Sequence, residues 1–161
     1  MVISTLYRSY LAAGISITLF MIILFASFKL GMISMLPNFL PIIYGLGFMS
    51  FLDISLNMTT LMVGSISLGL VVDDTIHFLQ NFEDYFKKKK NPKEAVEKTL
   101  LGVGRSLTFT TIILVSGFIS SISADMTDLI NFGLVTSFTI SVALLVDLIV
   151  LPSLLVLFYR K

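Results

Sequence analysis

Two adjacent aspartates inside an apolar run are the residues best able to do chemistry in this sequence. Asp73 and Asp74 end the segment Gly69-Leu70-Val71-Val72-Asp73-Asp74, within a stretch long enough to cross a bilayer. One charge at the centre of a membrane-spanning helix costs roughly 2.5 to 3.5 kcal/mol even on the lower scales. Such a pair requires a partner, a bound proton or a water-filled path, so we interpret Asp73 and Asp74 as candidate proton-relay residues. The alternative is that they only hydrogen-bond to a neighbouring helix and fix its packing.

Helical spacing places other polar and small residues around this pair. Ser65, Gly69, Asp73 and His77 recur every four residues and share one helix face, with Asp74 about 100° away. Gly69 is predicted to support the site by letting another helix approach closely. His77 is either a supporting residue or a side chain that reaches water at the inner interface. Asp73 and His77 have ligand-like spacing, but the sequence has no cysteine and no second histidine, so we predict no metal site.

Two positions later in the chain could join the relay. Thr110 lies in the hydroxyl-rich run Ser106-Leu107-Thr108-Phe109-Thr110-Thr111, although hydroxyls in lipid usually bond back to their own helix. Asp147 is a third carboxylate in an apolar segment, four residues after Ala143. For Asp147 a functional role and a packing role are both open.

The elements that position these residues must lie in lipid. Hydrophobic residues make up 56% of the 161-residue chain, charged residues only 13%, and the mean hydropathy is +0.97. Soluble domains carry about 25% charged residues, so this composition excludes an ordinary soluble domain. We predict an all-α polytopic membrane protein with a single transmembrane domain over residues 1–161. Windows of about 20 apolar residues give five spans, at about 11–28, 32–52, 58–80, 106–123 and 129–151.

Positive charges predict the sidedness of these spans. Five of the eleven lysines and arginines fall between Lys87 and Lys93, and Arg160 and Lys161 follow the last span. The positive-inside bias places both regions in the cytoplasm and the N-terminus outside, with Arg8 opposing this orientation. An outside N-terminus before five spans leads us to expect that an exported segment precedes the chain in a longer protein.

The connection between the third and fourth spans is predicted to contain a helix. Asn91-Pro92-Lys93-Glu94 has the pattern of an N-cap followed by a proline in the first turn. We expect a short helix at about 92–104 on the inner membrane surface; the alternative is a solvated linker. The basic run has no interleaved aromatic residues, so nucleic acid is not implied. No G-x-S-x-G motif accompanies the single histidine, and we predict no enzyme.

Four segments resemble the C-terminal transmembrane repeat of the resistance-nodulation-division (RND) superfamily. They are FKLGMISMLPNFLPI, LNMTTLMVGSISLGLVVDDTIHFLQNF, GRSLTFTTIILVSGF and LLVDLIVLPSLL. Within the superfamily they are most similar to the hydrophobe exporters, the MMPL lipid transporters and the Patched-like proteins.

This resemblance implies a proton-motive-force-driven exporter of lipids or other hydrophobic molecules in a bacterial inner membrane. It implies proton-relay roles for Asp73, Asp74 and Thr110, with Gly69 as a packing glycine, and a proton gradient rather than a bound cofactor. Its partners would be the bilayer, the hydrophobic substrate, and an N-terminal repeat with its exported domain or a second copy.

Other readings stay open. The chain could be a lipid-binding or structural membrane module like the sterol-sensing proteins, which would not need the acidic pair, or a protein-translocation auxiliary of the same superfamily. An intramembrane aspartyl protease would need Asp73 and Asp147 to face each other.

Overall fold

The computed structural model describes residues 2–159, and this part of the chain is helical without β-strands. The helices are α1 (Val2–Phe25), α2 (Phe28–Phe51), α3 (Met58–Lys89), α4 (Pro92–Thr99), α5 (Arg105–Ile119), α6 (Thr127–Leu145) and α7 (Leu151–Tyr159). Two π-helical turns, η1 (Leu100–Gly104) and η3 (Val146–Val150), join α4 to α5 and α6 to α7, and a 3₁₀ turn, η2 (Ser120–Ser123), follows α5.

Five continuous helical stretches are long and apolar enough to cross a membrane. They are Arg8–Phe25, Phe28–Phe51, Met58–Lys88, Pro92–Ser123 and Thr127–Tyr159. The predicted all-α fold with five such helices is confirmed. Several stretches extend beyond the predicted spans, because backbone hydrogen bonding continues past the apolar window. The 32 residues of α3 measure about 48 Å at 1.5 Å per residue, which exceeds a hydrocarbon core of about 30 Å.

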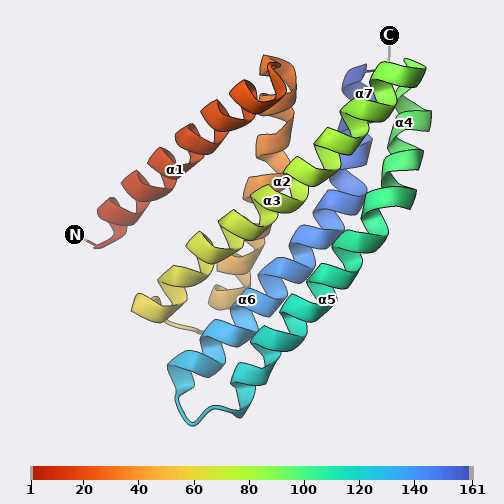
Figure 1. Cartoon of the computed structure of the whole chain (residues 1–161). Coiled ribbons are helices and arrows are strands. Elements are labelled where there is room, and N and C mark those ends of the chain that lie inside the picture. The colour runs from red at the N-terminus through yellow and green to blue at the C-terminus, as the bar shows by residue number, and fades with distance from the viewer. Residues whose placement is uncertain (1, 160–161) are drawn as a thin grey trace.

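The helices form a bundle from which α1 leans away (Figure 1). In the view, α3, α6 and α5 run side by side, and the N-terminal end of α1 diverges from them. The α1–α2 junction, the end of α3, the start of α4 and the end of α7 all lie at the same end of the molecule. The main core is at this end, around the fully buried Phe78, Leu79 and Phe82 of α3, which pack with Leu30 and Leu151.

The helix predicted near residues 92–104 exists but is not a separate element. Asn91 caps α4 by accepting a hydrogen bond from the backbone N–H of Lys93 at 3.2 Å, as expected. The chain then continues through η1 into α5, because no proline interrupts it there. Ala95, Val96 and Thr99 are buried, and α4 packs on α3 and α7. Its location at the membrane surface stays a prediction, and Arg160 and Lys161 lie outside the described residues.

Candidate functional site

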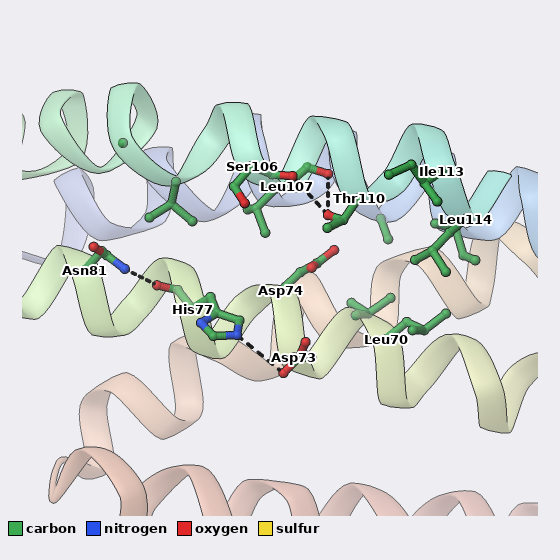
Figure 2. A pocket seen from close by; sticks show the side chains of 15 residues that line it. Leu70, Asp73, Asp74, His77, Asn81, Ser106, Leu107, Thr110, Ile113 and Leu114 are labelled. Carbon is green, nitrogen blue, oxygen red and sulfur yellow. Dashed lines mark hydrogen bonds and ion pairs between the residues drawn. The ribbon is translucent and has the colours of Figure 1, made fainter. Parts of the chain in front are cut away.

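A pocket of about 530 Å³ lies between α3 and α5, with α6 forming part of its wall. It brings together four of the predicted site residues: Asp73, Asp74 and His77 from α3 and Thr110 from α5. Leu70 and Leu114 are among the apolar residues that line the rest (Figure 2). The pocket therefore combines a carboxylate pair, an imidazole and hydroxyl groups in otherwise apolar surroundings.

The two aspartates differ in their surroundings. Asp74 is half-buried and points from α3 toward the α5 wall that carries Ser106 and Thr110 (Figure 2). Asp73 is exposed, and its Oδ1 lies 3.8 Å from Nε2 of His77, one helical turn away. This contact is an ion pair only when His77 carries a proton, and it is longer than a hydrogen bond.

The Thr110 hydroxyl is engaged with its own helix. Its oxygen lies 3.1 Å from the carbonyl oxygen of Ser106 and 3.0 Å from the carbonyl oxygen of Leu107, and its single proton is donated to these two acceptors. This is the alternative considered for hydroxyls in an apolar helix. Rotation of the hydroxyl toward Asp74 would be needed for a relay role, which stays a prediction.

The helix face that carries Ser65, Gly69, Asp73 and His77 is exposed. A Cβ atom built on Gly69 would meet no other atom within 4 Å. No helix of residues 2–159 therefore packs closely on Gly69, and its role in allowing another helix to approach stays a prediction. The physical reason is that this face lies on the opposite side of α3 from Thr75 and Phe82, which are buried against the rest of the bundle.

Asp147 belongs to a second polar cluster that is fully buried. Its Oδ1 lies 3.0 Å from the Thr75 hydroxyl, which lies 2.8 Å from Oδ1 of Asn38. The three side chains come from η3, α3 and α2, and each is 0% exposed. Thr75 is about 200° around α3 from Asp73, so Asp147 and Asp73 do not face each other as an aspartyl protease would require.

The number of available protons limits which hydrogen bonds this cluster can form. The Thr75 hydroxyl has one proton and cannot donate to both neighbouring oxygens. One solution is a proton on Asp147, so that Asp147 donates to Thr75 and Thr75 donates to Asn38. The other is an exchanged amide, with Asn38 Nδ2 donating to Thr75 and Thr75 to Asp147. As placed, Asn38 Nδ2 and Asp147 Oδ2 have no hydrogen-bond partner, and no lysine, arginine or histidine pairs with Asp147 within the described chain.

Sequence reasoning did not find Asn38 or Thr75. Asn38 lies between two prolines of an apolar helix, and Thr75 directly follows the acidic pair. Polar residues in membrane-spanning segments usually have a partner, and this signal could have marked both. Their mutual contact could not be read, because the partners are 37 and 72 positions apart.

Residues 2–161 match the sequence model of the AcrB/AcrD/AcrF family. The chain belongs to the AcrB/AcrD/AcrF family. This confirms the predicted RND superfamily, and this membership points to the membrane part of a transporter rather than to a catalytic enzyme. A curated relative is the Methanocaldococcus jannaschii protein named "Putative membrane protein MJ1562", which is 32% identical over 143 residues. The match covers 89% of this chain but only 37% of the relative. The AcrB/AcrD/AcrF chain described here thus spans about a third of that relative, and its assignment to a finer branch stays a prediction.

Proposed function

We propose that the chain is part of the membrane domain of a proton-driven exporter of lipids or other hydrophobic molecules. Asp73 and Asp74 exchange the driving protons, and His77 and Thr110 support the exchange. The observation that carries this proposal is the acidic pair on a membrane-spanning helix of an RND-family chain, opening on a pocket with Ser106 and Thr110 opposite. A proton-binding carboxylate changes its charge, and a helix bundle with two arrangements can couple that change to movement.

The open face of α3 supports the proposed partner. The Asp73 side chain is 70% exposed and that of His77 is 59% exposed, on a helix with the composition of a membrane span. A carboxylate facing lipid is costly, and intramembrane charges almost always face the interior of a bundle or a water-filled cavity. A second repeat, or a second copy of this chain, would cover Ser65, Gly69, Asp73 and His77 and complete the proton path.

The test is export of a fluorescent lipid from cells that produce the complete transporter. Asp73→Asn and Asp74→Asn remove one carboxylate each with little change in shape. Either change is expected to reduce proton-dependent export at least about 100-fold, in keeping with the loss of an essential proton carrier. Asp84→Asn is the matched control, because Asp84 is an exposed carboxylate of the same helix outside the pocket.

The outcomes separate the proposal from its alternatives. A protonophore should abolish export by the unchanged protein and by the Asp84→Asn variant. Export that survives in both pocket variants with unchanged protonophore sensitivity would make the pair structural. Lipid binding without any proton-dependent export would favour a sterol-sensing-like module.

A further inference from the structure

A cationic pocket of about 460 Å³ lies at the end of the molecule where α2 begins and α3 and α7 end. Three lysines from different elements line it: Lys29 near the start of α2, Lys90 after α3 and Lys93 in the first turn of α4. None of the three forms an ion pair with a carboxylate within the part of the chain that the structure describes. The acidic residues nearby are paired with other lysines, Glu83 with Lys87 at 3.0 Å and Glu94 with Lys98 at 3.7 Å.

The local structure holds these charges in place. The Lys29 ammonium lies 4.7 Å from the ring centroid of Tyr159 and donates to the carbonyl oxygen of Phe158. Lys90 has a left-handed backbone, with φ of 53°, and turns the chain sharply from α3 to α4. The N-terminus of the long α4–α5 helix adds a partial positive charge beside Lys93. The pocket is therefore suited to an anion.

An apolar groove of about 540 Å³ continues from this pocket between α2 and α7. Lys29 and Phe158 line both the pocket and the groove. Phe28, Met32 and Leu36 follow one another every four residues along the groove and are 71%, 52% and 50% exposed. From Phe28 to Leu36 the groove follows the helix axis for about 12 Å.

The geometry points to a binding site for an anionic phospholipid, with the headgroup phosphate among Lys29, Lys90 and Lys93 and one acyl chain along the groove. Free phosphate would use the lysines but not the groove, and a neutral lipid would use the groove but not the lysines. An anionic phospholipid uses both, because its phosphate fits the lysines and its acyl chain fits the adjoining groove. Basic pockets between membrane helices commonly bind such headgroups. The site is separate from the aspartate pocket and does not depend on proton coupling.

The test uses a single tryptophan placed where the pocket and groove meet. The sequence has no tryptophan, so Phe158→Trp gives one reporter in the full chain. After reconstitution, its fluorescence is quenched by brominated phosphatidylglycerol or brominated phosphatidylcholine, and the ratio of binding constants is measured. The anionic lipid should bind at least about fivefold more tightly, a ratio that one lysine near the surface can supply, and the preference should weaken in high salt.

The ratio of binding constants is compared between two triple variants. Lys29→Gln, Lys90→Gln and Lys93→Gln together should bring the ratio to within about twofold of unity. Lys87→Gln, Lys88→Gln and Lys98→Gln remove the same number of charges at the same end but outside the pocket, and should leave the ratio unchanged. Circular dichroism establishes that each variant keeps its helices.

Three results would overturn the assignment. These are an unchanged protein with no anionic preference, an equal loss of preference in both triple variants, and displacement of brominated phosphatidylglycerol by millimolar inorganic phosphate. The last result would mean that the pocket recognises free phosphate rather than a lipid. The Asp74→Asn variant should retain the lipid preference, so that failure of the exporter proposal and failure of this one are distinguishable.

Discussion

At the scale of single residues, Asp73, Asp74 and Asp147 occupy three different environments. Asp73 is exposed beside His77, Asp74 is half-buried in the pocket, and Asp147 is fully buried against Thr75. The first two suit the proposed proton exchange because both line the pocket between α3 and α5. Asp147 suits the linking of helices, because its contacts join η3 through Thr75 to Asn38 of α2.

The Thr75 hydroxyl is expected to stabilise the protein. Thr75→Val keeps the side-chain shape but leaves Asn38 and Asp147 buried without their shared partner. Leaving a buried polar group unpaired costs about 1 to 3 kcal/mol, so the free energy of unfolding in detergent should fall by about that amount. Thr108→Val is the control, because the Thr108 hydroxyl bonds back to Gly104 of its own helical segment at 2.8 Å. Equal losses of unfolding free energy in the two variants would mean that the buried cluster makes no specific contribution to stability.

A proton on Asp147 makes a separate prediction. Asp147→Asn is then a neutral replacement that can still donate to Thr75, and the free energy of unfolding should change by less than about 1 kcal/mol. Asp147→Leu removes the hydrogen bonds and should cost more, about 1 to 3 kcal/mol. Infrared spectroscopy of the unchanged protein should show a protonated carboxyl band that the Asp147→Asn variant lacks. A band that is absent at neutral pH would favour the exchanged-amide arrangement instead.

At the scale of helices, the sequence predicted which segments are helical better than where they end. Apolar windows identify five stretches because lipid requires every backbone group to be paired within the helix. The same windows miss the last nine residues of α3 and the whole of α4, because charged residues continue a helix once it leaves the apolar layer. Gly69 shows a second limit: helical spacing defines a face, but only the tertiary arrangement determines what covers it.

Two glycines test this point about helix contacts. A Cβ atom on Gly133 of α6 would lie 2.7 Å from Cβ of Ser121 and would also meet the carbonyl oxygen of Phe118, whereas Gly69 has open space. Gly133→Ala should therefore destabilise the chain by about 1 to 3 kcal/mol, as overpacking does. Gly69→Ala should be neutral or slightly stabilising, by up to about 1 kcal/mol, because alanine favours a helix. Chemical unfolding of the isolated chain measures both.

Gly69→Ala also reports on the proposed partner. If a second repeat covers this face of α3, the same change in the complete transporter should lower its stability or its export rate. If the change lowers neither the stability of the isolated chain nor the stability or export rate of the complete transporter, no helix packs closely on Gly69.

At the scale of the whole molecule, the sequence predicted the superfamily and the acidic pair but not the buried cluster. Asp73 and Asp74 are adjacent in sequence, so their pairing is visible without a structure. Asn38, Thr75 and Asp147 come together only when α2, α3 and η3 pack. The cationic pocket likewise depends on the start of α2 lying beside the end of α7, which composition cannot show.

Orientation in the membrane is a prediction at this scale. The absence of cysteine in the sequence allows single cysteines to be labelled without background. Cysteines at Asp53 and Asp125 should react with an impermeant reagent added outside, and a cysteine at Lys88 should react only after the membrane is opened. Labelling at Lys88 from outside would reverse the orientation, and labelling of all three from one side would contradict five crossings.

The most direct test of the central claim is the proton movement that accompanies substrate export. The complete transporter is placed in liposomes that contain a pH-sensitive dye, and a hydrophobic substrate is added under a proton gradient. We predict substrate-dependent proton flux in the unchanged protein and in the Asp84→Asn variant, and a loss of at least about 100-fold in Asp74→Asn. Substrate-dependent proton flux at the unchanged rate in both Asp73→Asn and Asp74→Asn would contradict proton exchange at the acidic pair.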